Sequence, residues 1–308
     1  MRFSDSIYIA GHTGLVGSAL VRLLKKRGFK NLLMKPHNEL DLRNQSQVQK
    51  FFREHSPDYV FLAAARVGGI LANWNSPAEF IYDNLMISTN IIHESYNSGV
   101  KKLVNLGSSC IYPKLSRQPI NESSLLTGLL EPTNEPYAIA KITGIKLCDS
   151  YRRQYGVDFV SAMPTNLYGP NDNFDLETSH VFPALLRKIH EAREKNNTSV
   201  TIWGSGTPRR EFLYVDDAAD ALLFLMNHFS ESGPINVGTG EDISILELAE
   251  LISKIVGFDG VIELDQSKPD GTPQKLLDIS RISDLGWKPS TELKDGIRKT
   301  YDWFLENC

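Results

Sequence analysis

The chain reads Ile7-Tyr8-Ile9-Ala10-Gly11-His12-Thr13-Gly14-Leu15-Val16-Gly17 near its start, and these residues are the main basis for the fold that we expect. Its four apolar residues predict a buried strand, and the apolar spacing that continues to residue 27 predicts a helix directly after it. Three glycines at such a junction allow a tight turn, a close approach of the backbone to a pyrophosphate, and close packing of the helix on the strand. The free N–H groups at the start of the helix suit a bound anion. The stretch therefore predicts a dinucleotide-binding strand and helix.

The rest of the first half alternates between short apolar runs and amphipathic segments. Apolar runs at residues 32–34, 59–62, 103–106 and 159–163 predict strands, and the segments 45–52, 84–97 and 137–155 predict helices, the first of them capped by Asn44. This alternation is typical of a parallel sheet that has helices on both faces. We therefore predict an α/β fold in which residues 1–165 form a Rossmann-type doubly wound parallel sheet that binds a dinucleotide.

After about residue 165, glycine and proline become denser along the chain. Apolar periodicity still predicts helices at residues 181–194, 216–229, 245–256 and 293–305. We interpret residues 166–308 as a smaller C-terminal α/β substrate lobe. Some of its segments are expected to return to the main sheet.

Composition and charge narrow the class of protein. The chain has 308 residues, of which 41% are hydrophobic and 23% are charged, as in ordinary globular proteins. Its formal net charge of -4 argues against a nucleic-acid-coating protein, because binding a phosphate backbone needs surplus positive charge. Cys110, Cys148 and Cys308 form neither a disulfide framework nor a zinc-ligand pattern, so we expect a cytoplasmic protein without a metal site. We see no signal peptide, and no stretch approaches the roughly 20 apolar residues of a membrane span.

The end of the second predicted strand indicates which dinucleotide binds. Folds that prefer NAD usually carry a carboxylate there, which holds the ribose 2′-hydroxyl. Residues 34–37 are Met-Lys-Pro-His and contain no carboxylate, whereas Lys35 and His37 can face a 2′-phosphate. We therefore expect NADP, used as NADPH, to be the cofactor.

Tyr137 and Lys141 lie one helical turn apart, and so on one face of a helix. An ammonium near a tyrosine favours the phenolate and lowers a pKa that is ordinarily near 10. Ser108 or Ser109, just after the fourth predicted strand, is expected to hold the substrate oxygen. Each signal is common alone, but together with the glycine loop they indicate a short-chain reductase site.

Cys110 directly follows the serine pair and is expected at the mouth of the same pocket, where a thiol can act as a base. An isolated cysteine is more often a small buried hydrophobe, and it is the catalytic neighbourhood that favours the chemical role. His180 begins the helix after the 173–179 loop and can supply the partnering acid.

Longer stretches of the chain closely resemble the GDP-L-fucose synthase family of extended short-chain dehydrogenases. The resemblance covers almost the whole chain and is carried by residues 9–12, 63–70, 106–114, 131–141, 163–170, 203–212 and 267–273. The stretches Ser-Ser-Cys-Ile-Tyr-Pro and Asn-Glu-Pro-Tyr-Ala-Ile-Ala-Lys within it are much more specific than the general reductase motifs.

This resemblance implies a bifunctional enzyme that epimerises C3 and C5 of GDP-4-keto-6-deoxy-D-mannose and then reduces its C4 ketone with NADPH, which gives GDP-L-fucose. It implies Cys110 as base, His180 as acid, Ser108 and Tyr137 as oxyanion partners, and Lys141 as the group that tunes Tyr137. The implied cofactor residues are Gly11, His12, Thr13, Gly14, Leu15, Val16, Gly17, Lys35, His37, Asp41, Leu42, Leu106, Gly107, Ser108, Ser109, Lys141, Pro164, Thr165, Asn166, Leu167 and His180. The implied substrate residues are Arg187 or Lys188, Trp203, Arg210 and Asp270. A homodimer that pairs helices 84–97 and 137–155 across a two-fold axis is also implied.

The sequence departs from the family pattern at three positions. Thr13 and His37 stand where bacterial members carry arginines that face the 2′-phosphate, which leaves Lys35 as the main basic candidate. Lys188 stands for the second arginine of a pair on the substrate helix, a change that can soften diphosphate binding without altering the chemistry.

Three other functions compete with this interpretation. The same residues can serve an epimerase or reductase of another GDP-keto-sugar, such as a GDP-6-deoxy-heptose. A sugar-nucleotide 4,6-dehydratase or 4-epimerase is disfavoured, because dehydratases place an Asp-Glu pair where this chain has Cys110-Ile111. A non-catalytic cofactor sensor on the same fold is also disfavoured, because such proteins typically lose the tyrosine or the lysine.

Overall fold

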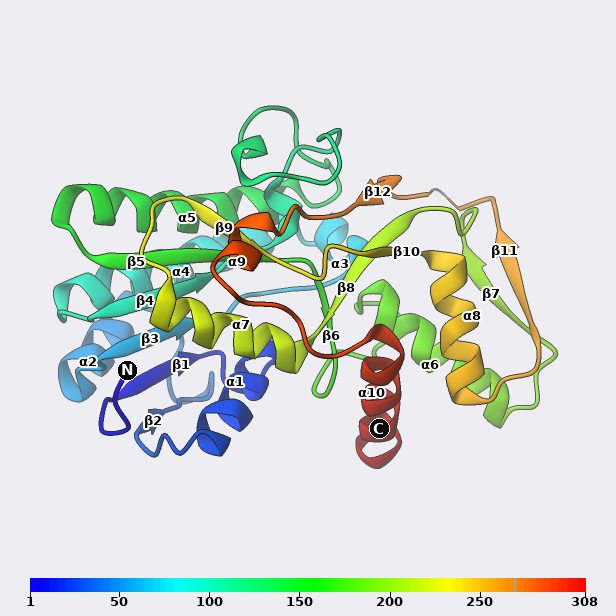
Figure 1. Cartoon of the computed structure of the whole chain (residues 1–308), viewed down its shortest axis with the longest axis horizontal. Coiled ribbons are helices and arrows are strands. Elements are labelled where there is room, and N and C mark those ends of the chain that lie inside the picture. Colours follow the sequence, from blue (N-terminus) through cyan, green and yellow to red (C-terminus); the bar gives the residue numbers. More distant parts are fainter. Residues whose placement is uncertain (269) are drawn as a thin grey trace.

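The computed structural model describes residues 1–268 and 270–308, and its first layer is a six-stranded parallel sheet. The strands lie in the order β2-β1-β3-β4-β5-β9 (Figure 1). Their bounds are Ile7–Ala10 for β1, Leu32–Leu33 for β2, Tyr59–Leu62 for β3, Lys102–Leu106 for β4, Asp158–Pro164 for β5 and Pro234–Val237 for β9. The parallel α/β fold predicted from the sequence is confirmed.

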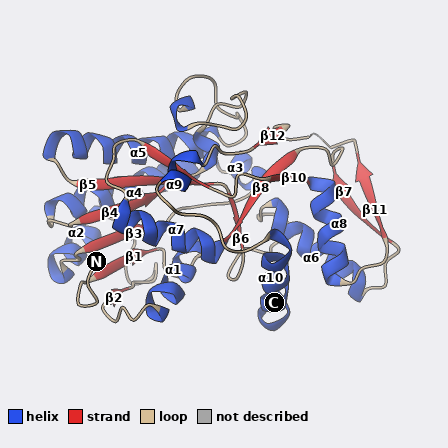
Figure 2. Ribbon diagram, viewed as in Figure 1, coloured by secondary structure: helices blue, strands red, loops and turns tan. Residues whose placement is uncertain are grey.

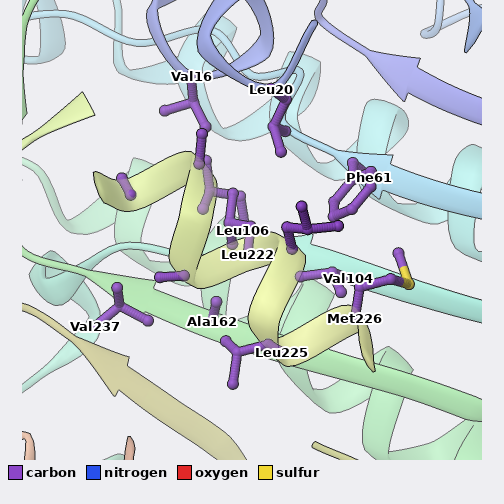
Figure 3. Close-up of a cluster of buried hydrophobic side chains, with 14 of the residues drawn as sticks. Val16, Leu20, Phe61, Val104, Leu106, Ala162, Leu222, Leu225, Met226 and Val237 are labelled. Carbon is purple, nitrogen blue, oxygen red and sulfur yellow. The ribbon is translucent and has the colours of Figure 1, made fainter. Parts of the chain in front are cut away.

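Helices cover both faces of this sheet (Figure 2). They are α1 (Leu15–Lys26), α2 (Gln45–His55), α4 (Pro77–Asn97), α5 (Glu135–Tyr155) and α7 (Val215–His228), while the short helix α3 (Ile70–Asn75) precedes α4. Apolar side chains of α1 and α7 pack on one face, around Phe61 and Val104 of the central strands (Figure 3). Side chains of α2, α4 and α5 pack on the opposite face with Leu103 and Phe159. Both faces are therefore buried, which explains why the strands are mostly apolar rather than alternating between apolar and polar residues.

Residues 166–308 contribute a smaller second layer of short strands and helices. The strands are β6 (Asn166–Tyr168), β7 (Ser199–Trp203), β8 (Arg209–Tyr214), β10 (Asp242–Ser244), β11 (Val261–Asp265) and β12 (Gln274–Lys275). The helices are α6 (Val181–Glu194), α8 (Ile245–Val256), α9 (Ser280–Asp284) and α10 (Leu293–Asn307). A separate apolar cluster that includes Phe182, Leu248 and Ile297 joins α6, α8 and α10. This part lies beside the carboxyl end of the main sheet (Figure 1).

Three segments of the second half lie with the main sheet: α7, β9 and α9, whose Ile282 belongs to the same apolar cluster as α1 and α7. Strand β9 pairs in parallel with β5, where Ala162 is opposite Ile235, and α7 packs against α1 through the first apolar cluster. The path of the chain therefore returns to the first layer between residues 215 and 237, and it then leaves again for β10.

Individual residues determine where helices α2 and α4 begin. The Asn44 side chain accepts a hydrogen bond from the Gln47 N–H at 3.1 Å, which confirms the predicted cap of α2. Helix α4 begins at Pro77, seven residues earlier than the periodicity predicted, because proline at the first helical position loses no hydrogen bond. Within the described residues, no helix combines the length and the apolar character that crossing a bilayer requires.

Candidate active site

The glycine loop has the geometry that a dinucleotide needs. Gly11 has a φ of 84°, and a Cβ there would lie 2.7 Å from the backbone of Ala64. A Cβ on Gly17 would lie 1.9 Å from the carbonyl oxygen of Gly11, so helix α1 can pack this closely on β1 only with glycine. Gly14 caps α1 without any side-chain hydrogen bond, which leaves the first N–H groups of the helix available to an anion. The loop therefore fits a pyrophosphate.

The side chain of His12 is a second indication that a ligand binds at the glycine loop. Its Nδ1 is buried and has no hydrogen-bond partner among the described residues. A buried polar atom without a partner is costly unless a ligand or water satisfies it. Thr13 is exposed, Leu15 is half-buried, and Val16 packs into the core of the first cluster.

The residues after β2 carry the two basic side chains that are expected to contact the 2′-phosphate. Lys35 Nζ lies 2.8 Å from a carboxylate oxygen of Glu39, and Glu39 in turn raises the pKa of His12, which burial lowers. His37 Nδ1 lies 4.0 Å from Asp41, which is also held by Arg43 at 2.9 Å. His37 is exposed, whereas Lys35 is half-buried and already has an anionic neighbour. The Leu42 carbonyl accepts a hydrogen bond from Asn90.

Ser108 and Cys110 lie at the carboxyl end of β4, on a single 3-10 turn that begins at Ser109. The Ser108 hydroxyl accepts a hydrogen bond from the Cys110 N–H at 3.3 Å. Leu106, Gly107 and Ser109 are buried beneath this turn. Burial raises the pKa of the Cys110 thiol, while the Lys275 ammonium, a hydrogen bond with Ser108 and the Lys141 ammonium act in the opposite direction.

Helix α5 brings Tyr137 and Lys141 to the same place. Lys141 Nζ lies 5.7 Å from the centre of the Tyr137 ring, and it donates a hydrogen bond of 2.8 Å to the Leu106 carbonyl. Burial lowers the pKa of Lys141 to about 8. Burial also raises the pKa of Tyr137, and the nearby Cys110 raises it further, against a hydrogen bond with Ser108. The sequence argument that Lys141 depresses this pKa is thus not what the structure shows, because desolvation of the phenol is the larger effect.

His180 caps the start of α6 and is exposed, at the end of the 171–179 loop. Surrounding protein and the charge of Lys275 both lower its pKa. The charge of Lys275 thus acts on the pKa of both His180 and Cys110, the two groups expected to act on the sugar ring. The structure brings Ser108, Cys110, Tyr137 and Lys141 together directly.

The predicted substrate residues fall into two groups. Arg210 lies on β8 directly opposite Lys275 of β12, and the position of a Cβ on Gly271 would be 3.0 Å from its guanidinium. Arg187 is half-buried on α6 and bonds to Glu191 at 2.8 Å and to the Phe174 carbonyl at 3.1 Å.

The second group lies at the outer edge of the smaller layer. The Trp203 ring is 53% exposed, and the ammonium groups of Lys188 and Lys268 lie 5.6 Å and 5.5 Å from its centre. Asp270 accepts hydrogen bonds from the backbone and the hydroxyl of Ser205 at 2.9 Å and 2.7 Å. An exposed indole beside a fixed carboxylate suits a base and its sugar.

Thr165 and Asn166 follow β5, between Pro164 and Leu167, and both donate side-chain hydrogen bonds to the Glu211 carbonyl, at 3.1 Å and 2.8 Å. The Glu211 carboxylate is itself fully buried and accepts backbone N–H groups of Thr239, Gly240 and Leu277. It therefore ties the carboxyl ends of β9 and β12 to β8.

Sequence reasoning missed three charged residues of this region: Lys275, Glu131 and Glu211. Lys275 lies two residues beyond the end of the 267–273 stretch, and the signal that could have found it was a lysine beside a quoted motif. Glu131 begins the 131–141 stretch, but its partners Lys114 and Thr272 are distant in sequence. Only the fold brings these groups together.

A Rossmann sheet with a glycine loop and a serine, tyrosine and lysine beside it defines the class of dinucleotide-dependent short-chain reductases and epimerases. Comparison with known proteins gives the particular assignment. Residues 7–238 match the model of the NAD dependent epimerase/dehydratase family, and the chain belongs to this family.

Individual relatives cover the whole chain. GDP-L-fucose synthase 1 of Arabidopsis thaliana is 58% identical over 304 residues, which cover 99% of this chain and 94% of the relative. A GDP-6-OMe-4-keto-L-xylo-heptose reductase from C. jejuni has a TM-score of 0.94 at 43% identity, covering 100% of this chain and 99% of that one. A GDP-L-fucose synthetase from Naegleria fowleri bound to NADP has a TM-score of 0.92 at 32% identity, covering 100% and 96%. The resemblance to GDP-L-fucose synthases is confirmed.

Proposed function

We propose that this chain converts GDP-4-keto-6-deoxy-D-mannose to GDP-L-fucose by epimerising C3 and C5 and then reducing the C4 ketone with NADPH. The observation that carries the proposal is the position of Cys110, on the turn that also holds Ser108 beside Tyr137. A thiol at this position can act as the base that removes a proton from a carbon atom, in addition to the reduction that the other residues serve. The GDP-L-fucose synthase relatives support the substrate, and the NADP-bound relative supports the cofactor.

The reduction uses the residues around the end of β4. Bound NADPH supplies the hydride that C4 receives. Tyr137 gives its phenolic proton to O4, and its raised pKa keeps that proton in place at neutral pH. Ser108 donates a hydrogen bond to the same oxygen as negative charge develops on it. The Lys141 ammonium then stabilises the phenolate that Tyr137 becomes.

The epimerisation uses the groups around Lys275. The C4 ketone acidifies the protons on C3 and C5, so a base and an acid can invert both centres through enolates. Cys110 takes the proton as a thiolate, which the ammonium groups of Lys275 and Lys141 stabilise. His180 returns a proton, and its lowered pKa makes its charged form a stronger acid.

The remaining predicted residues hold the nucleotide part of the substrate. Arg210 and Lys275 place two cations side by side on β8 and β12, an arrangement that suits a diphosphate. Arg187 of α6, whose guanidinium bonds to Glu191, is proposed as a further partner of the diphosphate. Trp203 and Asp270 are proposed to contact the nucleoside.

A second candidate substrate is another GDP-keto-sugar. The heptose reductase from C. jejuni matches this chain over its full length at 43% identity, so a related sugar can fit the same framework. The test is to incubate the protein with GDP-4-keto-6-deoxy-D-mannose and either NADPH or NADH, and to identify the sugar product by NMR. GDP-L-fucose formed with NADPH supports the main proposal. Turnover of only a GDP-keto-heptose supports the second candidate, and no turnover of either rejects an enzymatic function.

We further propose that the protein works as a cytoplasmic homodimer that pairs α4 and α5. Apolar side chains are exposed on both helices, including Tyr82 at 59%, Tyr155 at 47% and Ile139 at 40%. Tyr155 stacks on Tyr96 of the neighbouring helix with ring centres 4.3 Å apart. The cysteines at 110, 148 and 308 are free, which suits a reducing compartment.

A further inference from the structure

A short segment after β3 borders the site at which the ketone is proposed to be reduced. Gly68 lies beside Phe80 of α4, since a Cβ on Gly68 would be 3.2 Å from the tip of the Phe80 ring. The Phe80 ring in turn packs edge-on against the Tyr137 ring, with ring centres 6.3 Å apart. One aromatic side chain therefore separates this segment from the phenol that is proposed to protonate O4.

Gly69, the next residue, holds the loop that ends at His180. Its N–H donates a hydrogen bond of 2.8 Å to the Thr178 carbonyl. A Cβ on Gly69 would lie 2.5 Å from the Ser179 carbonyl oxygen, so the two backbones meet with no room for a side chain between them. Because Ser179 directly precedes His180, this contact sets where His180 begins α6.

The loop before His180 is also held from within. The Asp175 carboxylate accepts hydrogen bonds from the N–H and the hydroxyl of Thr178, at 3.0 Å and 2.8 Å. The Asp175 carbonyl accepts a further hydrogen bond of 2.9 Å from the Ser179 N–H. These bonds leave the loop little freedom of its own, so its contact with Gly69 determines the position of His180.

The side chain of Asn73 holds the two glycines. Asn73 is buried on α3, and its amide nitrogen donates hydrogen bonds to the Gly68 carbonyl at 2.8 Å and to the Gly69 carbonyl at 3.0 Å. Carbonyl groups that are removed from water need such a donor, because an unpaired polar group is costly. Asn73 therefore fixes a glycine pair that has no side chains of its own to hold it.

We propose that Asn73 and Gly69 are positioning residues that hold His180 in place for the return of protons to C3 and C5, and that they do not serve hydride transfer to C4. This inference rests on the proposed function, in which His180 is the acid. A displacement of about 1 Å can slow a catalytic step roughly 100-fold. Tyr137, in contrast, is held by α5 and by the Phe80 ring, which both remain when Asn73 is replaced.

The experiment measures how the products divide, a ratio that does not depend on how much of a variant is folded. An enolate that His180 fails to protonate takes its proton back from Cys110, so the carbon keeps its original configuration when C4 is reduced. Asn73→Ala and Gly69→Ala are each incubated with GDP-4-keto-6-deoxy-D-mannose and NADPH. NMR then gives the ratio of GDP-L-fucose to sugars that are reduced at C4 without both inversions. We expect this ratio to fall at least about tenfold in both variants.

The added methyl group of Gly69→Ala acts through its contact with Ser179, because the φ of Gly69 is -65°, which alanine adopts without strain. Asn75→Ala is the matched control for Asn73→Ala, since Asn75 is an exposed asparagine at the end of the same helix, and should give the wild-type ratio. In a His180→Gln background, Asn73→Ala should change the ratio less than about twofold, because the two residues act through one group.

A second assay measures oxidation of GDP-L-fucose by NADP⁺, which reports the hydride step in reverse. Its rate per folded molecule should change less than about twofold in Asn73→Ala and Gly69→Ala, because the groups that serve the hydride step are intact. A loss of oxidation as large as the change in product ratio would overturn the inference, since the variants would then disturb the hydride step as well.

The remaining outcomes separate this inference from the function on which it rests. A wild-type product ratio in either Asn73→Ala or Gly69→Ala overturns the inference alone. So does an effect of Asn73→Ala that is equally large with and without His180. A wild-type protein that neither forms GDP-L-fucose nor oxidises it refutes the proposed function itself.

Discussion

The side-chain nitrogen of Lys141 lies 2.8 Å from the carbonyl oxygen of Leu106, so helix α5 is joined to the last residue of strand β4 at the point where the reactive groups gather. The bond fixes an ammonium in a buried position, 5.7 Å from the Tyr137 ring centre. Burial in turn lowers the pKa of Lys141 to about 8. The buried position in which this hydrogen bond holds Lys141 therefore also makes the charge of Lys141 sensitive to pH.

This sensitivity predicts the pH dependence of the reduction. Lys141 carries its charge below its pKa and loses it above, so kcat/KM for the reduction should fall as the pH rises through about 8. The measurement is the rate of NADPH oxidation between pH 6 and 10 at low substrate concentration. Lys146→Met, which changes an exposed lysine on the same helix, should leave the profile unchanged. A flat profile up to pH 10 would show that the Lys141 charge is not required.

Cys110→Ser should separate the two halves of the reaction. A serine hydroxyl is a far weaker acid than a thiol, so it does not ionise at neutral pH and cannot act as the base. Deuterium incorporation at C3 and C5 should fall by a factor of at least 100, within the range of general-base contributions. Oxidation of GDP-L-fucose by NADP⁺ should persist, because Ser108, Tyr137 and Lys141 are intact. Unchanged deuterium incorporation would remove Cys110 from the mechanism.

The main sheet could be predicted from the sequence because each of its signals is local. The strand Tyr59–Leu62 has the predicted bounds, and so do α6 and α8. A strand that is buried on both faces is a continuous run of apolar residues, so the bounds of the run indicate the bounds of the strand. Strand β2 proved one residue shorter than the apolar run 32–34. The end of an edge strand depends on its single partner, which sequence periodicity does not reveal.

The site was predictable only where its members are close in sequence. Ser108 and Cys110 share a turn, and Tyr137 and Lys141 share a helix, so spacing alone placed each pair together. Lys275 reaches the site because β12 pairs with β8, a contact between segments more than 60 residues apart. Its role therefore had no sequence signal of its own. The pKa of Tyr137 likewise depends on how deeply the folded chain buries the phenol, which the spacing of residues in the sequence does not reveal.

Lys35→Met should weaken the preference for NADPH. The Lys35 ammonium sits 2.8 Å from Glu39, after the strand whose end faces the ribose. Without it, Glu39 faces a 2′-phosphate uncompensated, so kcat/KM with NADPH should fall roughly tenfold while the value with NADH stays the same. Lys50→Met is the control, since Lys50 forms an equivalent pair with Glu54 on α2. Equal losses with both dinucleotides would contradict a role at the 2′ position.

Light scattering tests the proposed dimer. The exposed apolar side chains of α4 and α5 should be covered in a two-fold pair, so the mass at micromolar concentration should be twice that of the chain. Replacing Tyr82 by Asp puts a charge into that contact and should shift the protein toward a monomer. A monomeric wild type at these concentrations would reject the dimer.

Asp172 should make the stability of the protein depend on pH. Its Oδ2 is buried without a hydrogen-bond partner among the described residues, and burial raises the pKa of this carboxyl to about 7. A carboxyl with a raised pKa keeps its proton in the folded state, so its stabilising contribution is complete below about pH 4 and is lost as the pH rises through 7. Between these values the cost should grow by roughly 1 kcal/mol per pH unit.

Asp172→Asn cannot ionise, and it keeps an oxygen for the hydrogen bond from the Asn173 N–H. The variant should therefore match the wild type in urea unfolding below about pH 4 and have a higher midpoint at pH 8. Asp175→Asn is the control of opposite sign, because hydrogen bonds from Thr178 and Glu177 lower the pKa of Asp175 and make its charge favourable in the folded state. That variant should be less stable than the wild type at pH 8. If Asp172→Asn loses stability equally at both pH values, the carboxyl is charged when folded and has a partner that the hydrogen bonds of the loop do not reveal.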